Sequence, residues 1–241
     1  ELIGVDSALA EAEVILLAEE ILSAAGISFS IHVGHLALMR SLLSGMPEQE
    51  QKKVRMFLDK KDVEGLRDYL SLNGRDDLCS SLVRLASARD LEEAFAITGE
   101  LPERERIEEL FSILDWSGIA YTLDPGIARG LDYYTGMVFE VFAGNLGAEN
   151  QVLGGGTYRL AHLFGGEDTP SCGFAVGFDR VMVSRGDQAP SRTIVAGIAH
   201  TPEGRDWALA VARKFRAAGI RTELDLSGRS IGQQLSRIAR S

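Results

Sequence analysis

Between residues 128 and 180 the chain combines three glycine-rich segments with apolar runs, and this stretch constrains the fold most strongly. It contains Arg-Gly-Leu-Asp-Tyr-Tyr-Thr-Gly at 129–136, three glycines at 154–156 and Gly-Phe-Ala-Val-Gly-Phe-Asp-Arg at 173–180. The run from Met137 to Phe142 is apolar on both alternation faces except at Glu140. Such a run is typical of a strand that is covered on both sides. We therefore expect the chain to fold around a central sheet.

Two arginines flank the strands of this stretch. Arg129 lies just before the strand predicted at 137–142, and Arg180 follows a second apolar run, so both are expected to reach one cleft. A guanidinium binds phosphate oxygens in pairs, and neighbouring glycines let the backbone approach a bulky anion. The pattern favours a polyphosphate ligand. The alternative is that both arginines form ordinary ion pairs at strand ends and that the glycines are turns, since glycine-rich loops alone are weak signals.

The order of these residues resembles a known enzyme family. Residues 129–136, with Val138-Phe139-Glu140 after them, are similar to the histidine-specific signature of histidyl-tRNA synthetases, and residues 173–180 resemble motif 3 of class II synthetases. Glu-Leu-Ile-Gly at 1–4, with the run that follows, is similar to the segment after motif 2. The sequence from Ile194 onward resembles the start of the family's anticodon-binding domain. Nearly the whole chain is covered.

The resemblance implies the fold class and a division of the chain. We expect an α/β (α+β) protein with the mostly antiparallel sheet of class II synthetases, a helical insertion and part of an α/β anticodon-binding domain. The implied parts are the first part of the catalytic core at 1–34, the helical insertion at 35–117, the core with the histidine signature and motif 3 at 118–188, and the partial anticodon-binding domain at 192–241.

Helix-spaced apolar residues dominate the first half of the chain. They predict helices at 7–25, 36–43, 49–58, 63–72, 78–87, 91–97 and 103–116, while alternation predicts strands at 28–33 and 119–124. The charged helices after residue 35 form either a plain structural subdomain or the family's insertion, which is expected to contact the acceptor end of tRNA. The residues to test for RNA contact are Lys52, Lys53, Lys60 and Lys61.

The C-terminal segment differs from the rest in charge and pattern. Residues 191–241 hold nine basic and four acidic residues, net +5, whereas residues 1–190 are net −15. A basic segment on an acidic body suits a local contact with RNA phosphates, although solvated helix faces give the same count. After a linker at 187–191, strands at 193–198 and 220–224 alternate with helices at 205–218 and 231–240, which predicts a parallel sheet. With only two strands predicted, we expect the natural chain to continue past Ser241.

The resemblance also implies residues for ATP and for catalysis. Arg129 would stabilise charge at the α-phosphate and the carboxylate and is the implied catalytic residue. Arg180 would hold the γ-phosphate, and Gly177 belongs to the same ATP-binding motif. The first step joins a carboxylate, already an ionised nucleophile, to the α-phosphorus of ATP, so positioning and charge stabilisation carry it. Mg²⁺ is expected to accompany ATP.

Histidine selection requires polar groups that match an imidazole. The family implies a pocket built from Glu1, Tyr133, Tyr134, Gly154, Gly155 and Tyr158. Asp132 is as well explained by support of Arg129 or of a turn as by substrate contact. Where many bacterial members have Arg-Tyr-Asp after the glycines, this chain has Thr157-Tyr158-Arg159. Arg159 is then either a surface residue or the replacement for a lost contact.

Composition excludes several other functions. The two cysteines and four histidines are scattered without the spacing of a disulfide framework or a zinc site, so no metal site is expected. No apolar run approaches the ~20 residues of a membrane span, and no leader pattern opens the sequence. We expect a cytoplasmic protein without a membrane partner. The net charge of −10 argues against a protein that grips nucleic acid over its whole surface.

The expected ligands are histidine, ATP and tRNA(His). Motifs 1 and 2 of the family, which carry dimer contacts and an ATP-binding arginine, have no counterpart here, so a fragment is expected, with a homodimer for the complete protein. The alternative function is that of a synthetase-like paralogue without aminoacylation activity, such as the regulatory subunit of ATP phosphoribosyltransferase, which binds histidine as a signal. A structural partner that binds no ligand is a third, weaker possibility.

Overall fold

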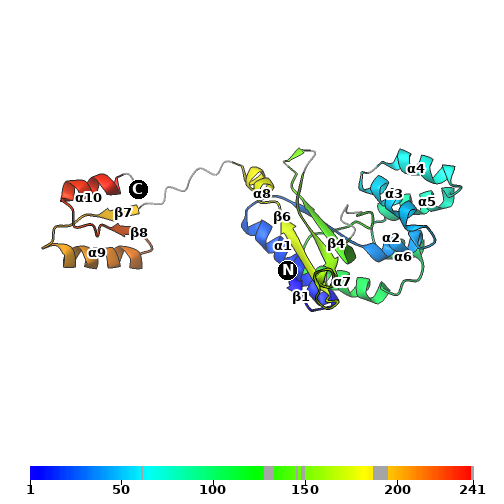
Figure 1. Ribbon diagram of the computed structural model, residues 1–241, viewed down its shortest axis with the longest axis horizontal. Helices are drawn as coiled ribbons and strands as arrows, with labels where there is room; N and C mark the ends of the chain where they lie inside the picture. The colour runs from blue at the N-terminus through cyan, green and yellow to red at the C-terminus, as the bar shows by residue number, and fades with distance from the viewer. Residues whose placement is uncertain (61, 128–132, 145, 148–149, 187–194, 240–241) are drawn as a thin grey trace. The chain divides into compact units, whose positions relative to one another are not determined.

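The structure, a computed structural model, describes residues 1–60, 62–127, 133–144, 146–147, 150–186 and 195–239. The chain divides into two compact units, Glu1–Asp187 and Gln188–Ser241. The division falls at the segment predicted to be a linker. Each unit is described by itself below (Figure 1).

A six-stranded sheet forms the centre of the first unit. Its strands, in spatial order, are β1 (Leu2–Ile3), β6 (Ser171–Val176), β5 (Gln151–Tyr158), β4 (Tyr134–Phe142), β2 (Ser30–His35) and β3 (Thr122–Leu123). Every neighbouring pair is antiparallel except β2 and β3, which are parallel. The mostly antiparallel sheet expected from the sequence is therefore confirmed.

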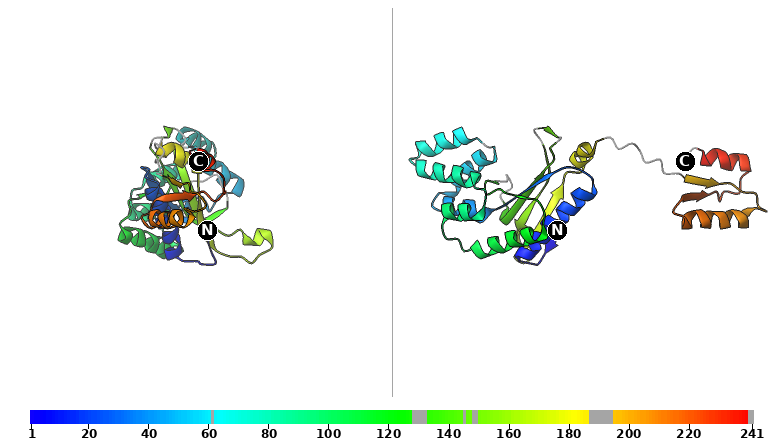
Figure 2. Two further views of the ribbon diagram at one scale, coloured as in Figure 1. Left: turned by 90° about the vertical axis from the view of Figure 1, so that its left-hand side faces the viewer. Right: turned by 180° about the vertical axis from the view of Figure 1, so that it is seen from behind.

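One face of this sheet is covered by helices. Helix α1 (Ala8–Ala24) is capped by the Ser7 hydroxyl, which accepts from the Ala10 amide at 3.1 Å. It lies against β6 and α7 (Arg104–Ser117), as the views from opposite sides show (Figures 1 and 2). The apolar cluster beneath these helices includes Met137, Phe139 and Val141, which alternate along β4. The other face of the sheet carries a smaller apolar cluster of Ile127, Tyr134 and Val138.

The helices between β2 and β3 share two apolar clusters. They are α2 (Leu36–Leu43), α3 (Glu48–Asp59), α4 (Val63–Leu72), α5 (Asp76–Ser87), α6 (Leu91–Thr98) and α7. Helices α2 to α5 enclose their own cluster, with Leu43, Leu66, Leu70 and Leu82 buried in it. Phe95 of α6 and Ile107 of α7 belong instead to the cluster of the sheet. The segment predicted as one helical insertion, 35–117, thus contributes to both clusters.

The expected and observed strands differ in extent. The strand predicted at 119–124 is the two-residue β3, while β4 begins three residues earlier than its apolar run. Strand β5 continues through the three glycines to Tyr158, because both of its neighbours pair with it along that length. The glycines are therefore part of the sheet and not a turn.

The second unit alternates strands and helices. Strands β7 (Val195–Ile198) and β8 (Arg221–Leu224) pair in parallel, as predicted, and helices α9 (Arg205–Ala217) and α10 (Ile231–Ile238) follow them in turn. Ala208 and Ala212 of α9 pack with Ile198 in its small apolar cluster.

In the described residues of both units, no helix has the length and apolar character needed to cross a membrane.

His35 joins the sheet to the helices and is a buried titratable group. It is the last residue of β2 and the cap of α2, where its Nδ1 accepts from the Ala37 amide at 3.2 Å. Its side chain is 5% exposed. Burial, followed by the charges of Arg106 and Arg40, lowers the pKa of His35 to about 4. A neutral imidazole is therefore part of the fold.

This burial predicts an acid-sensitive stability. Because the pKa of His35 is lower in the folded than in the unfolded chain, the stabilisation is present above pH 6.5 and is lost as the pH falls from 6.5 toward 4. Between pH 7.5 and 5.5 it should remove about 1.3 kcal/mol from the free energy of unfolding. Urea unfolding at both pH values measures the loss. His35→Asn, which keeps a capping side chain, should remove this contribution, whereas substitution of the exposed His162 by Asn should not.

Candidate active site

The face of the sheet away from α1 has a floor of glycine. Residues paired across neighbouring strands point to the same face, and Val138, Gly156 and Gly173 form one such row. The adjacent row, Phe139, Gly155 and Phe174, points to the apolar cluster on the opposite face. On the site face, β5 and β6 therefore lack side chains at two paired positions, Gly156 and Gly173.

Close packing requires these glycines. A Cβ at Gly156 would lie 2.6 Å from the Met137 carbonyl oxygen and 2.8 Å from the Tyr134 ring. A Cβ at Gly173 would overlap the carboxylate of Glu1, and one at Gly155 would overlap the Gly173 carbonyl and lie 2.6 Å from the Phe139 ring. The missing side chains at Gly156 and Gly173 thus leave room for Tyr134 and Glu1 on the site face, whereas the missing side chain at Gly155 leaves room for Phe139 on the core face.

Three tyrosines and Glu1 surround this floor. The rings of Tyr133 and Tyr134 lie 4.6 Å apart between centroids, with their hydroxyls 3.4 Å apart, and the Tyr158 ring meets Tyr133 edge-on at 6.1 Å. The Tyr158 hydroxyl donates to Glu1 Oε2 at 2.6 Å. Burial and this carboxylate raise the pKa of Tyr158 to about 12. Hydroxyls on rigid rings, together with the Glu1 carboxylate, can recognise a polar, planar group.

A cavity of about 1000 Å³ lies between the sheet and helices α3 to α5, at the end of the sheet where β4 finishes and β5 begins. Its lining includes His32, Phe57, Leu66, Asp124, Glu140 and Arg180. His32 Nδ1 lies 3.2 Å from Asp124 Oδ2, and the His32 ring meets Phe142 edge-on at 5.0 Å. Apolar residues of the helices face polar residues of the sheet across this space, which suits a ligand with a flat apolar part and polar substituents.

Arg180 reaches this cavity from helix α8 (Phe178–Arg185), which follows β6. Its Nη1 donates to the Gln151 carbonyl oxygen at 2.7 Å, and the Gly177 amide donates to the Val152 carbonyl at 2.8 Å. Both contacts lie at the start of β5. Arg180 is thus held at the cavity as a fixed positive charge, although it occupies a helix and not a strand end.

The structure brings most of the predicted site residues to one face. Glu1, Tyr133, Tyr134 and Tyr158 meet around the glycine floor, and Arg180 and Gly177 lie at the cavity end of β5. Gly154 shares the site face, but the predicted Gly155 points to the core face, because residues alternate along β5. Arg129 and Asp132 lie outside the described residues, as does Lys61. Lys53 lies over the Tyr69 ring within the helical part, 5.2 Å from its centroid, and does not line the cavity.

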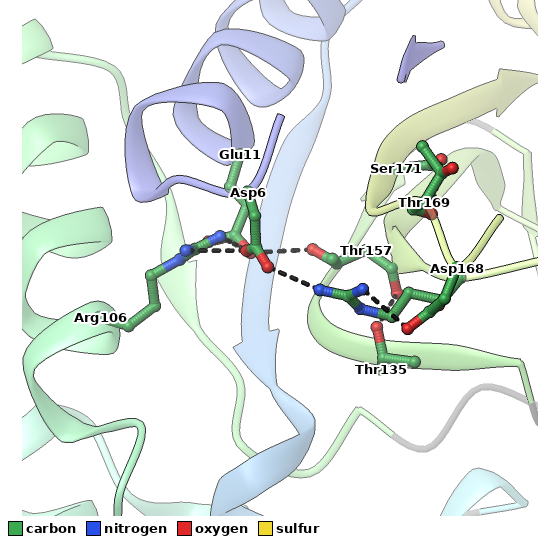
Figure 3. Close-up of polar contacts among 9 residues, drawn as sticks. Asp6, Glu11, Arg106, Thr135, Thr157, Asp168, Thr169 and Ser171 are labelled. Carbon is green, nitrogen blue, oxygen red and sulfur yellow. Dashed lines mark hydrogen bonds and ion pairs between the residues drawn. The ribbon is translucent and has the colours of Figure 1, made fainter. Parts of the chain in front are cut away.

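Sequence reasoning missed the groups that support the site from behind. Glu11 of α1 binds Arg106 and Thr157 (Figure 3). Arg159, which the sequence left as either a surface residue or the replacement for a lost contact, forms ion pairs with Asp6 and Asp168. Arg40 of α2 donates to the carbonyl oxygens of Tyr134 and Thr135 at 2.7 and 2.8 Å. One signal was present in the sequence. Helical spacing places Glu11 on the apolar face of α1 with Ala8, Ala12 and Ile15, where an acidic residue requires a partner.

Comparison with known proteins gives a consistent result. The family described as histidyl-tRNA synthetase matches residues 1–181. Histidine–tRNA ligases from Methanoregula boonei and Methanospirillum hungatei are 58% and 56% identical, covering 100% of this chain and 59% of each relative. The chain thus spans about three fifths of the length of these curated relatives. A crystal structure from Bacillus halodurans, described as an ATP phosphoribosyltransferase regulatory subunit/histidyl-tRNA synthetase, is 28% identical with a TM-score of 0.76, covering 98% of this chain and 64% of that one.

The close packing around the glycine floor predicts that one added methyl group lowers the stability of the first unit. Gly156→Ala should lower the free energy of unfolding by about 2 kcal/mol, because the new Cβ meets the Met137 carbonyl and the Tyr134 ring. Chemical denaturation measures this change. The matched control is Gly144→Ala, where a Cβ meets nothing within 4 Å. Equal stability of the two variants would show that the strands do not approach as closely as described.

Proposed function

Since the chain belongs to the histidyl-tRNA synthetase family, we propose that its full-length form is a histidine–tRNA ligase. It activates histidine with ATP to histidyl-adenylate and transfers the histidyl group to tRNA(His). The observation that carries the proposal is the meeting of Glu1, Tyr158 and two further tyrosines over the glycine floor. These groups come from three separate places in the sequence, at residue 1, residues 133–134 and residue 158.

Histidine is proposed to bind on this floor. A neutral imidazole has one N–H donor and one acceptor nitrogen, and Glu1 with the hydroxyls of Tyr133, Tyr134 and Tyr158 offers both acceptors and donors. Gly154, on the site face, would let the strand backbone lie close to the amino acid or the adenylate, whereas Gly155 points to the core face and contributes backbone alone. A side chain of similar size without ring nitrogens would leave these polar groups unpaired, which is the strongest source of discrimination available to such a pocket.

ATP is proposed to occupy the cavity at the start of β5. Arg180 would hold the γ-phosphate, with Gly177 in the same turn, and Arg129 is proposed as the catalytic residue at the α-phosphate. Mg²⁺ is proposed to enter with ATP, bound mainly by phosphate oxygens and water. No group of three or more potential ligand side chains that could hold a metal occurs in the described residues, and we assign no protein ligands to the ion.

The proposed chemistry requires positioning more than proton transfer. A histidine carboxylate oxygen attacks the α-phosphorus, the bond to the bridging oxygen breaks, and pyrophosphate leaves with the electron pair. The carboxylate is already ionised, so no general base is needed. Arginines that face the α-phosphate and γ-phosphate stabilise the charge on the transferring and departing groups. In the second step, a hydroxyl of the terminal tRNA ribose attacks the acyl carbon and releases AMP.

The remaining parts are proposed to serve tRNA binding. Helices α3 to α5 form one wall of the cavity, and we propose that they contact the acceptor end through Lys52, Lys53, Lys60 or Lys61. The basic second unit would contact the anticodon region. A homodimer and a cytoplasmic location are proposed from family membership. A histidine-binding regulatory paralogue is the second candidate, suggested by the name of the Bacillus halodurans protein. The relatives from Methanoregula boonei and Methanospirillum hungatei, which are more than 50% identical over the aligned region, carry the ligase name instead.

The histidine pocket yields a prediction for Tyr158→Phe. In a form extended to the length of the relatives, loss of the hydroxyl that donates to Glu1 should raise the KM for histidine about tenfold in histidine-dependent ATP–pyrophosphate exchange. The KM for ATP should stay within about twofold. Tyr121→Phe is the matched control, because its hydroxyl donates to Asp115 at 2.6 Å away from the site. Histidine binding without any exchange in the parent protein would support the regulatory paralogue.

The ATP cavity yields a prediction for Arg180→Ala. Loss of a guanidinium that faces the γ-phosphate should raise the KM for ATP at least tenfold while the KM for histidine changes little. Arg180→Lys should recover part of the loss because it restores a positive charge. Arg185→Ala, at the exposed end of the same helix, is the control. An unchanged KM for ATP in Arg180→Ala would place the phosphates elsewhere.

A further inference from the structure

A carboxylate on the core side of the sheet is fully paired directly behind the histidine pocket. The Glu11 side chain is 2% exposed. Arg106 donates to it twice, from Nε at 3.2 Å and from Nη2 at 3.1 Å, and the Thr157 hydroxyl donates to Oε1 at 2.9 Å (Figure 3). A buried carboxylate without partners is strongly unfavourable, so this geometry is held tightly. Glu11 thereby joins α1, α7 and β5.

Arg106 extends this contact toward the protein surface. Its Nη1 lies 3.0 Å from Asp6 Oδ1, Asp6 Oδ2 lies 2.7 Å from Arg159, and Arg159 lies 3.1 Å from Asp168. Burial would lower the pKa of Arg106, but the hydrogen bonds and charges of Glu11 and Asp6 outweigh it and raise the pKa. Asp6 and Asp168 are 49% and 63% exposed, so the outer pairs contribute little. The buried pair of Glu11 with Arg106 therefore contributes most of the stabilisation in this chain of ion pairs.

The buried pair acts on the pocket through Thr157. Thr157 and Tyr158 are consecutive in β5, so their side chains point to opposite faces, one toward Glu11 and the other toward Glu1. A carboxylate that fixes Thr157 from the core side therefore fixes the direction of Tyr158 on the site side.

Thr157 also holds the start of β4. The pairing of β4 with β5 changes register from Tyr134 to Val138. The residues of β4 within this shift are therefore not held by the regular pattern of backbone hydrogen bonds. There the Thr135 hydroxyl donates to the Thr157 carbonyl at 3.2 Å, next to Tyr134. A Cβ on the neighbouring Gly136 would lie 3.5 Å from Thr157 and 3.7 Å from Glu11. One side-chain hydrogen bond thus joins β4 to Thr157 where the register shifts, and Gly136 leaves room for Thr157 and Glu11 to lie close by.

We propose that Glu11 is a positioning residue for histidine recognition, acting through Thr157 on Tyr158 and on the start of β4. The inference rests on the proposed function and extends it. It concerns the histidine end of β5 alone, because the contacts of Arg180 and Gly177 are at Gln151 and Val152, the opposite end of the strand. Loss of the Glu11 contact therefore changes histidine binding and leaves ATP binding intact.

The test uses Thr157→Val in the form extended to the length of the relatives. Valine keeps the branched shape and leaves the Glu11–Arg106 pair in place, so it removes one hydrogen bond. The KM for histidine should rise about fivefold, while kcat and the KM for ATP stay within about twofold. Thr157→Ser, which keeps the hydroxyl, should restore the KM for histidine. Glu11→Gln should act in the same direction, with Glu13→Gln on the exposed side of α1 as control.

The outcomes separate this inference from the proposed function. An unchanged KM for histidine in Thr157→Val, or equal changes in the KM for histidine and for ATP, would overturn the positioning role while the ligase stands. Absence of exchange in the parent protein would overturn the ligase. The positioning role is then decided by a crystal structure of Thr157→Val. Departure of the Tyr158 hydroxyl from Glu1 supports it, and an unchanged contact overturns it.

Discussion

The close approach of β4, β5 and β6 is the constraint on which the site depends. Gly155, Gly156 and Gly173 allow it, because a Cβ at any of them would meet backbone, a ring or the Glu1 carboxylate. A glycine in a strand normally weakens it, since it has no side chain to pack and loses more backbone entropy on folding. Here the rings of Phe139 and Phe174, whose centroids lie 6.1 Å apart, pack on the core face and offset part of this loss. On the site face the missing side chains leave room for Tyr134 and Glu1.

The same sheet serves as a packing surface on one side and a recognition surface on the other. On the core side, α1 and α7 cover Met137, Phe139 and Val141, and the Glu11–Arg106 pair is the charged contact within that layer. On the site side, strand β5 carries two different tasks at its two ends. Its start holds Arg180 and its end holds Tyr158, so the proposed sites for phosphate and for histidine are kept apart by the length of one strand. Rigid backbone, and not a loop, sets their separation.

Local sequence patterns predicted much of this fold and part of the site. Helices α2 and α4 have the predicted bounds, and the parallel pairing of β7 with β8 followed from the alternation of strands and helices. The glycine segment gave no local indication that β5 continues to Tyr158, because glycine has no strand preference. The partners Glu11 and Arg106 are 95 residues apart, as are Arg40 and Thr135, and periodicity within a helix does not identify a partner in another element. The family resemblance supplied Glu1 and the tyrosines as pocket residues, which spacing alone could not have joined.

Histidine binding over the glycine floor is the central proposal. The most direct measurement is a crystal structure with histidine bound, of a form extended to the length of the relatives. The account predicts the imidazole next to Gly156 and Gly173, with its nitrogens within hydrogen-bond distance of Glu1 or of the hydroxyls of Tyr133, Tyr134 or Tyr158. Histidine bound elsewhere on the chain, with these four side chains still in contact only with one another, would contradict it.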